Sequence, residues 1–555
     1  MGSCRAPEPV LDLPNVARPQ LRSTLRGVFR VYGFRVRLQP PIDWSMDPHE
    51  SLRFQAYLSN WDFMDRLLAG YRQTGDTAYL ELAAAIALDW IRANPRSAPA
   101  GGSGTWSGKI AGDRAPRLAY LLRAARCPGA LDRAEASELR ASLLEHVDIL
   151  LGPESAGDTN HALYVQIGLA AVAAQIPGLP GVNRIQATAE RRFREVLEGR
   201  LANGIWLEHS TSYQFLAIRV VERFLELTGG RDDGLMGDLK DMQEAAAWLT
   251  APDGRHTLLG DSRMLKAPPP IRRRAERLAG LRVFPRAGIA AAREGDSHLV
   301  VSAGFHNTTH KHADELSFEL SERGDRLVTD TGMYHKDPGE IRDFVVAARA
   351  HSTLTVDAQE FPATDSAQAY GSGLLAWGSG AGWHAVLASN PLLADQGVAH
   401  QRLFLYRPGV ALVVVDRARG PDVHSFERRI QLAPGVGTSA DGDGVLGLEA
   451  PGFAGAVFDT GSRAALALAE GAEDPLAGYM ASDYREWEAR TTVELTSEGS
   501  GLLRALTLAL DDRGTHATSV RWRGDEAAVR IAATHGRSTL EVARAGSALT
   551  VSEPG

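Results

Sequence analysis

The period of the hydrophobic pattern changes once along this chain, near the run Pro268-Pro269-Pro270. Before the run, from about residue 47, eight or so segments such as DTAYLELAAAIALDWIRANP carry apolar residues three and four positions apart, the spacing of amphipathic helices. After it, a dozen or more short segments such as ELSFELSE alternate in the manner of strands and are separated by Gly, Asp and Pro. The change predicts an α+β multidomain chain, helical first and β second.

The packing of each part follows from its connections. Short connections between the helical segments favour an α/α toroid or an α-solenoid, and the absence of a sequence repeat of fixed period disfavours a regular solenoid. Hairpin-length gaps between the strands predict large antiparallel sheets packed as a sandwich. We therefore predict an irregular, arginine-rich N-terminal arm at residues 1–45, an α/α toroid domain at 46–280 and an antiparallel β-sandwich domain at 285–555. The proline run is expected to form a stiff linker.

Length, charge and composition limit the classes of function that this chain can have. A chain of 555 residues exceeds what one core usually supports. A formal charge of −8 argues against general nucleic-acid binding, so an acidic partner would need a local basic site. The two cysteines, Cys4 and Cys127, cannot form a disulfide framework and fit a reducing compartment. With no apolar run of signal-peptide type and none of membrane-spanning length in the sequence, we expect a cytoplasmic protein without a membrane partner.

A histidine-rich stretch opens the β part of the chain. His310 and His312 alternate with Lys311, so on a strand they would point to the same face, and Asp330 and His351 follow. The segments LSFEL (316–320) and RLVTD (326–330) are expected to pair as strands. Imidazole and carboxylate groups together suit a divalent transition metal such as zinc. The alternative is a polar strand edge with solvated histidines.

Two helical segments also carry candidate chemistry. In GDTNHALYVQIG, Asp158 or Thr159 can cap a helix and place Asn160 and His161 in its first turn, where the helix end favours an anionic group. The alternative is an ordinary polar helix start. In WLEHSTSYQFLAI, Tyr213 lies within an amphipathic pattern, and the alternative there is a core-edge tyrosine with its hydroxyl in water.

These motifs occur together in one family. Their order resembles that of the heparinase II/III-like polysaccharide lyases, whose relatives include oligo-alginate lyases, from about residue 40 to at least residue 490. The matching text is Asn160-His161, Glu208-His-Ser-x-x-Tyr213, HKHADELSFEL from His310, VTDTGMY from Val328 and RAHSTLTVD from Arg349, with weaker matches at IDWSMDP from Ile42 and GYMASDYREWE from Gly478. The resemblance implies an N-terminal α/α toroid followed by an antiparallel β-sandwich.

The resemblance also implies roles for single residues. His312, Asp330 and His351 match the ligands of one structural zinc ion per chain; Tyr213 and His310 match the catalytic pair; and Asn160 and His161 match the residues that bind the substrate carboxylate. We further expect substrate contacts from residues near these positions, namely Glu208, His209, Gln214, Tyr334, Arg342 and Arg349. The sequence departs from the family at two points. Only Tyr334 is available where some relatives carry a second cleft tyrosine, and Ala-His-Ser replaces the usual Ala-His-Asn.

The chemistry implied is β-elimination on a uronic acid, which leaves an unsaturated uronate. Hydrogen-bond donors from Asn160 and His161 would stabilise the enolate-like charge. Tyr213 would protonate the departing O4 oxygen and, in a syn geometry, also remove the C5 proton. His310, neutral near pH 7 at an ordinary pKa of about 6.5, is the candidate base for the opposite epimer.

Two other functions stay open from the sequence. A glycoside hydrolase of acidic glycans needs two carboxylates across the bond, for which Glu208 and Asp158 are the candidates. A non-catalytic carbohydrate-binding protein would keep the zinc as a structural ion only. The sequence leaves open heparinoid, chondroitin-like, alginate and bacterial exopolysaccharide substrates, exolytic or endolytic action, and a homodimer through the β-sandwich.

Overall fold

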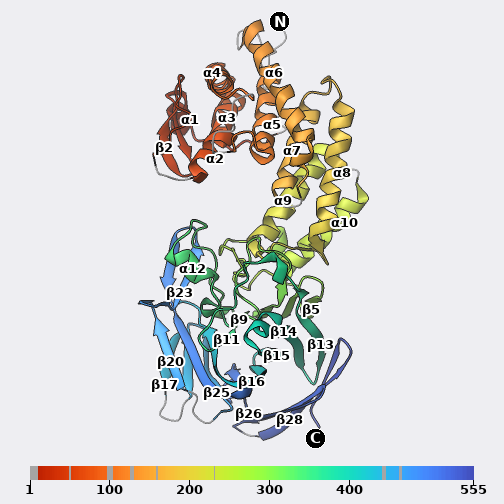
Figure 1. Cartoon of the computed structure of the whole chain (residues 1–555), viewed down its shortest axis with the longest axis vertical. Coiled ribbons are helices and arrows are strands. Elements are labelled where there is room, and N and C mark those ends of the chain that lie inside the picture. The colour runs from red at the N-terminus through yellow and green to blue at the C-terminus, as the bar shows by residue number, and fades with distance from the viewer. Residues whose placement is uncertain are drawn as a thin grey trace. The chain divides into compact units, whose positions relative to one another are not determined.

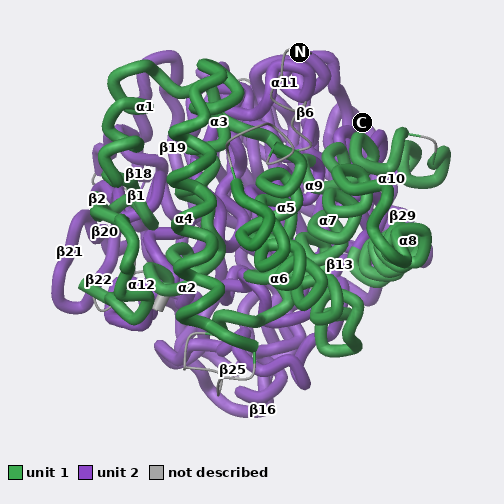
Figure 2. The backbone as a smooth tube through the Cα atoms, turned by 90° about the horizontal axis from the view of Figure 1, so that it is seen from above, with its two compact units in different colours: residues 1–200, 219–237 green, residues 201–218, 238–555 purple. Residues whose placement is uncertain are grey.

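A computed structural model describes residues 11–48, 52–96, 104–124, 131–157, 160–230, 232–440, 445–461, 465–534 and 536–554 of the chain. Its contacts divide the chain into two compact units (Figure 2). Unit 1 comprises residues 1–200 and 219–237, and unit 2 comprises residues 201–218 and 238–555. This division reflects contacts between residues and does not test the predicted domain bounds, which stay predictions.

Unit 1 is mainly helical (Figure 1). Its described elements are α1 (Arg18–Leu25), β1 (Val28–Val31), β2 (Phe34–Arg37), α2 (Leu52–Asn60), η1 (Asp62–Met64), α3 (Asp65–Thr74), α4 (Ala78–Ala93), α5 (Gly108–Ala124), α6 (Arg133–Leu151), η2 (Pro153–Ser155), α7 (Asn160–Gln175) and α8 (Val182–Arg200). Two further helices, α9 (Thr211–Thr228) and α10 (Asp233–Trp248), have one part in each unit.

The helices of unit 1 form where apolar spacing and end signals agree. Helix α6 begins with a capping box, in which Asp132 and Glu135 each accept the other's backbone N–H. Helix α5 buries Arg114, whose guanidinium lies 3.9 Å from the Trp90 ring centre and donates to the carbonyl of Ser59 at 2.8 Å. A fully buried guanidinium is tolerated here because aromatic faces and backbone carbonyls replace its water.

The prediction of an irregular N-terminal arm is wrong for residues 18–37. Pro19 occupies the first turn of α1, where its fixed φ suits a helix, and β1 pairs with β2 as a hairpin. The hairpin forms because the VFRV segment alternates, so that Phe29 and Val31 are buried between more exposed neighbours.

Unit 2 begins with short elements. They are β3 (Leu201–Ala202), β4 (Ile205–Trp206), the start of α9, the end of α10 and α11 (Pro269–Ala275). The expectation of a stiff proline linker is wrong, because Pro268 is the N-cap of α11 and the two prolines after it fill the first helical positions. Proline is favoured there because the first turn of a helix needs no N–H partner.

Two large antiparallel sheets make up most of unit 2 within the described residues (Figure 1). The first has five strands in the order β10-β9-β7-β6-β5, which are Asp325–Val328, Phe318–Glu322, Ser297–Ser302, Ile289–Glu294 and Gly280–Phe284. The expected pairing of the LSFEL and RLVTD segments is confirmed as β9 with β10.

The second sheet has 14 described strands, in the path β17-β18-β19-β25-β16-β15-β14-β13-β29-β28-β27-β26 with β11 beside β16 and β20 beside β25. In chain order these are β11 (Leu354–Val356), β13 (Leu374–Gly380), β14 (Trp383–Asn390), β15 (Ala399–Arg407), β16 (Ala411–Gln431), β17 (Gly437–Ala440), β18 (Leu446–Ala450), β19 (Phe453–Asp459), β20 (Ala465–Glu470), β25 (Thr491–Ala509), β26 (His516–Arg523), β27 (Glu526–Ala533), β28 (Gly536–Ala545) and β29 (Ala548–Ser552). Strands β13 and β29 meet in parallel through Trp377 and Ala548.

Smaller elements complete unit 2. They are β8 (Gly304–Phe305), α12 (Glu340–Val346), η3 (Ala348–Ala350), η4 (Ser366–Gln368), β12 (Gly371–Ser372), η5 (Pro391–Gln396), β21 (Ala472–Glu473), β22 (Leu476–Ala477), β23 (Tyr479–Asp483) and β24 (Glu486–Ala489).

One hydrophobic cluster contains side chains from both large sheets. Val301 and Leu320 of the first sheet share it with Phe404, Val414 and Leu508 of the second. The order of the elements confirms the predicted helical part followed by a β part. The toroid and the sandwich stay predictions.

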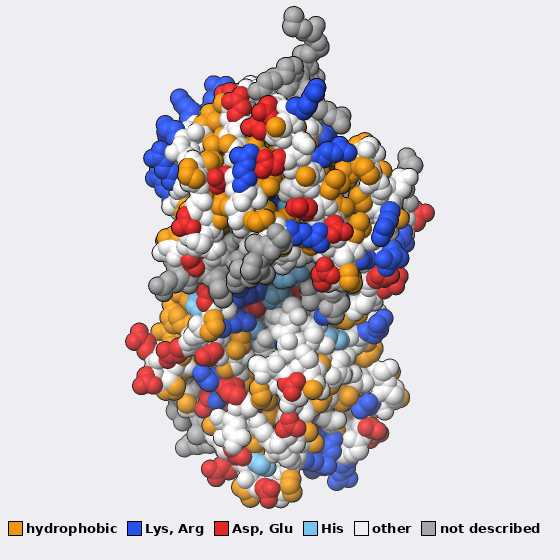
Figure 3. All heavy atoms as spheres, turned by 45° about the horizontal axis from the view of Figure 1, so that its top comes forward, with side chains coloured by type: hydrophobic (Ala, Val, Ile, Leu, Met, Phe, Trp, Pro, Cys, Tyr) orange, Lys and Arg blue, Asp and Glu red, His pale blue; other side chains and the backbone are white. Residues whose placement is uncertain are grey.

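No helix in the described parts of the chain is long and apolar enough to cross a membrane. Acidic and basic side chains are intermixed on the face drawn in Figure 3.

Candidate active site

The candidate site in unit 2 is built on two loops that touch backbone to backbone. His310 and His312 lie in the loop after β8 rather than on a strand, and His310 has a φ of 58°, so the predicted strand placement is wrong. The second loop carries Gly260 and Asp261, and the N–H of Asp261 donates to the carbonyl of His310 at 3.1 Å. A Cβ on Gly260 would lie 2.6 Å from that same carbonyl oxygen, so only glycine permits this approach.

Asp261 gathers the histidines and the cations of these loops. Its side chain is 2% exposed, and its two carboxylate oxygens lie 3.1 Å from His310 Nδ1 and 2.9 Å from His312 Nε2. Arg342, at the start of α12, donates to both oxygens, and Lys336 Nζ lies 3.6 Å from Oδ2. We call Asp261, His310, His312, Lys336 and Arg342 the Asp261 cluster.

The electrostatics of the cluster follow from this packing. Burial opposes the charge on Asp261, but hydrogen bonds from His310 and His312 and the charge of Arg342 hold the pKa of Asp261 well below its usual range. Burial lowers the pKa of His310, and the nearby charge of Lys336 adds to this effect, while the Asp261 hydrogen bond works against it. His310 is therefore neutral near pH 7, as an imidazole that accepts a proton must be.

Tyr213 lies against this cluster from the first turn of α9. Its ring stacks on His310 with the centroids 3.6 Å apart and the planes 20° from parallel. Lys336 Nζ is 2.8 Å from Tyr213 Oη and 2.8 Å from His310 Nδ1. Ser210 fixes the start of the helix, because its hydroxyl accepts the N–H of Tyr213 and donates to the carbonyl of Asp261. The predicted tyrosine and histidine thus form one contact pair.

The remaining substrate-contact candidates divide into three groups. Glu208 is fully buried, with one carboxylate oxygen 3.7 Å from His310 Nε2, and Arg342 belongs to the Asp261 cluster. Both therefore belong to the site.

Two candidates hold the backbone instead. His209 contacts the carbonyl of Thr309 through Nδ1 and accepts the N–H of His306 at Nε2, and burial lowers its pKa to about 3. Gln214 is 1% exposed, accepts the N–H of Trp206 and donates to the carbonyls of Gly204 and Met242. Their polar atoms are used within the fold, so we assign both to holding the loops in place.

The other two candidates lie outside the cluster. Arg349 pairs with Glu360 at 3.0 Å, and Tyr334 packs against Trp487 with ring centroids 5.5 Å apart. These contacts place neither side chain in the Asp261 cluster.

The predicted carboxylate-binding pair belongs to unit 1. Asn160 is the first residue of α7, as predicted, and is 8% exposed, while His161 beside it is exposed. The predicted capping residues Asp158 and Thr159 lie outside the described residues. The roles of Asn160 and His161 stay predictions.

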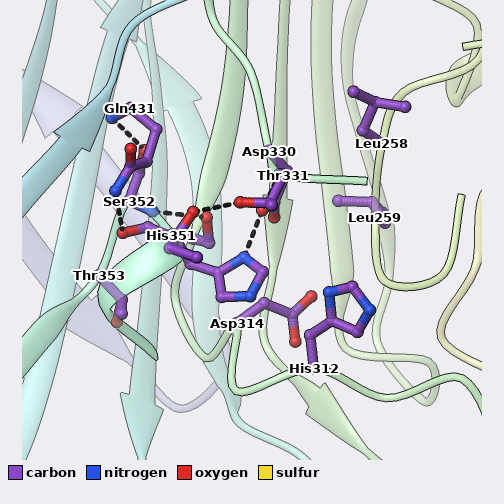
Figure 4. A network of polar contacts seen from close by, with 12 residues as sticks. Leu258, Leu259, His312, Asp314, Asp330, Thr331, His351, Ser352, Thr353 and Gln431 are labelled. Carbon is purple, nitrogen blue, oxygen red and sulfur yellow. Dashed lines mark hydrogen bonds and ion pairs between the residues drawn. The ribbon is translucent and has the colours of Figure 1, made fainter. Parts of the chain in front are cut away.

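Figure 4 shows the three predicted zinc ligands, His312, Asp330 and His351, and His312 is also a member of the Asp261 cluster. His351 Nδ1 hydrogen-bonds Asp330 Oδ1, and the ring centroids of His312 and His351 are 5.4 Å apart. Among the described residues, His312 Nδ1, His351 Nε2 and Asp330 Oδ2 are buried without a hydrogen-bond partner. Buried nitrogen and oxygen atoms without a hydrogen-bond partner suit a metal ion. Two imidazole nitrogens and one carboxylate oxygen are a typical set of zinc ligands.

The three predicted zinc ligands are not arranged as a metal site in this structure. No group of three or more His, Cys, Asp or Glu side chains in the described parts of the chain is arranged to hold a metal ion. In Figure 4 the Asp314 carboxylate lies between His312 and His351. The chemistry of the donor atoms thus fits zinc, and zinc itself stays a prediction.

Two members of the cluster were not expected from the sequence. Asp261 lies in LLGDS, where only its position after two buried leucines marks it, and Lys336 is a single lysine in a loop. Lys336 is 26 residues from His310 and 123 residues from Tyr213 in the sequence. Only folding brings these side chains into contact.

A known family profile matches part of this chain. The sequence profile described as heparinase II/III-like, C-terminal, matches residues 276–527. No curated protein matches the chain.

Solved structures are similar over almost the whole chain. A heparan sulfate lyase HepC mutant from Pedobacter heparinus has 18% identity and a TM-score of 0.74, covering 97% of this chain and 91% of its own. A structure of heparinase III has 15% identity and a TM-score of 0.81, covering 97% of this chain and 93% of its own. At these identities the likeness concerns the fold.

Proposed function

We propose that this chain is a polysaccharide lyase of the heparinase II/III-like family and that it cleaves a uronic-acid-containing glycan by β-elimination. The observation that carries the proposal is the Tyr213–His310 stack, in which a phenol and a neutral imidazole lie in contact beside two cations, Lys336 and Arg342. Acidic sugars require positive charge near the scissile bond, and elimination requires a base and an acid near each other.

In the proposed reaction, a base removes the C5 proton of the uronate, and the electron pair forms the C4–C5 double bond as the C4–O4 bond breaks. The departing oxygen takes a proton from an acid. Tyr213 serves as that acid, and on a syn substrate as the base as well. His310 is the base for the opposite epimer. Asn160 and His161 hold the uronate carboxylate and stabilise the charge that develops on it.

Hydrolysis is the second candidate, and the carboxylates near the stack argue against it. A glycosidase needs two carboxyl groups facing the bond, about 5–10 Å apart. In unit 2, Glu208 is fully buried against His310, and Asp261 is 2% exposed and bonded to four side chains. Neither carboxylate has the access to solvent and substrate that a glycosidase acid or nucleophile requires.

The remaining parts of the proposal rest on the family. We propose an α/α toroid and a β-sandwich as the two domains, and a cytoplasmic enzyme that acts on acidic oligosaccharides. His312, Asp330 and His351 would hold one zinc ion, which would brace the loops that carry His310 and Asp330. The ion would supply structural support, and side chains would carry out the proton transfers.

The test is ultraviolet absorbance during incubation with a panel of uronate polymers and oligomers. Only elimination creates a double bond conjugated to the uronate carboxylate. We expect a rise with at least one substrate, lost in Tyr213→Phe and kept in the control Tyr57→Phe, whose side chain is 40% exposed in unit 1. Reducing sugar released without a change in absorbance would refute elimination and favour the hydrolase.

A further inference from the structure

Lys336 bridges the two predicted catalytic side chains. It lies in the loop between β10 and α12, and its side chain is 18% exposed. Its Nζ is 2.8 Å from Tyr213 Oη, 2.8 Å from His310 Nδ1 and 4.7 Å from the centre of the Tyr213 ring. One ammonium group therefore contacts the phenolic oxygen, the ring face and the imidazole together.

We propose that Lys336 is a positioning residue that stabilises the ionised form of Tyr213 and aims its oxygen at the substrate. On a syn substrate, Tyr213 would then remove the C5 proton as a phenolate and return that proton to the leaving O4 oxygen. This inference rests on the proposed β-elimination.

The chemistry of the donor supports this assignment. A protonated lysine carries three N–H donors and no acceptor, so Tyr213 Oη must accept in the contact with Lys336. Accepting from a cation favours the negative form of the phenol, because the charge-assisted bond strengthens when the oxygen ionises. The oxygen keeps further lone pairs for the substrate proton.

The charges around the pair point the same way. Asp261 lies beside Lys336 as its counter-charge, with one carboxylate oxygen 3.6 Å from Nζ. Arg342 adds a second positive charge and pairs with the same carboxylate. The Glu208 carboxyl group lies 3.7 Å from the far nitrogen of His310 rather than on the Lys336 side.

His310 has two alternative partners at the same nitrogen. Nδ1 either donates its proton to Asp261 at 3.1 Å or, when the proton is on Nε2, accepts from Lys336 at 2.8 Å. A single tautomer satisfies only one of these contacts. The contact between Lys336 and Tyr213 is possible with either tautomer of His310, so the inference rests on that contact.

The experiment is a spectrophotometric titration of tyrosinate in the full chain without substrate. The Tyr213 signal is the difference between each protein and its Tyr213→Phe counterpart. We expect Lys336→Met to move the midpoint of Tyr213 ionisation upward by about 1–3 pH units, the range of one nearby opposite charge. Lys336→Arg should retain most of the wild-type midpoint. Lys240→Met, at an exposed lysine of α10, should leave it unchanged.

A rate measurement then connects ionisation to catalysis. In Lys336→Met, the rise of kcat with pH should move upward with the same midpoint, while KM changes little. An unchanged midpoint in both Lys336→Met and Lys336→Gln would overturn the inference. A shifted midpoint in a protein that eliminates no uronate substrate would refute the proposed function and still support the coupling of Lys336 to Tyr213.

Discussion

Replacing Asp261 with asparagine removes the charge that organises the candidate site while keeping the shape of the side chain. The carboxylate is 2% exposed and contacts two imidazoles, one guanidinium and one ammonium. The asparagine oxygen still accepts one hydrogen bond, but its NH2 group faces donors. The nearby Arg342, only 18% exposed, then loses its counterion.

The size of the effect follows from these contacts. Removing one partner of a buried ion pair costs about 3–5 kcal/mol, because the other charge stays desolvated. Since Arg342 and Lys336 keep partial access to water, we expect the lower end, ~3 kcal/mol of unfolding free energy. His310 also loses its main anionic partner. A positioned acid or base contributes roughly 10²–10⁴-fold to the rate, and we expect kcat to fall by the lower value, on the order of 10²-fold.

The assay pairs urea unfolding with the absorbance assay. Asp261→Asn should lower the unfolding midpoint without changing the m-value, which marks a loss of stability rather than of compactness. Asp422→Asn, at an exposed position of β16, is the matched control and should change neither quantity. Wild-type stability and kcat in Asp261→Asn would refute the reasoning that this carboxylate organises the site.

Three further predictions concern other parts of unit 2. His351→Ala should lower bound zinc, measured by elemental analysis, from about one ion per chain to none; equal zinc in both proteins would contradict the ligand assignment. His298 donates to the Trp248 carbonyl, and burial lowers its pKa to about 3, below the unfolded value of 6.5. Because the unfolded chain then binds more protons, stability should fall by roughly 3 kcal/mol from pH 6.5 to pH 4, and His298→Gln should show a flatter urea-unfolding profile; an equal slope in both proteins would count against it. Arg428→Met should cost about 3–5 kcal/mol, since it leaves Asp459 without its bidentate partner; a change below 1 kcal/mol in urea unfolding would refute this.

The order of helical and β parts could be predicted because hydrophobic period is a local property. The β9–β10 pairing was predictable for the same reason, since two alternating segments are separated by a short turn. The placement of His310 and His312 on a strand failed because His310 adopts a positive φ, which allows its loop to reach Asp261. Backbone conformations of this kind depend on tertiary contacts.

The candidate site was predictable only in part. Tyr213 and His310 were found through motif order, and the structure brings them into contact. Asp261 and Lys336 were not found, because a single carboxylate or lysine in a loop carries no periodic signal. Their importance comes from distances set by the fold between residues far apart in the sequence.

The most direct test of β-elimination is product analysis in water labelled with heavy oxygen. Elimination forms the double bond by losing the O4 oxygen with its leaving sugar, and no water is added. We predict two product halves whose masses sum to that of the substrate, with no label in either half and no products from Tyr213→Phe. One labelled oxygen per bond cleaved would show that water attacks the glycosidic bond, and it would contradict the proposed function.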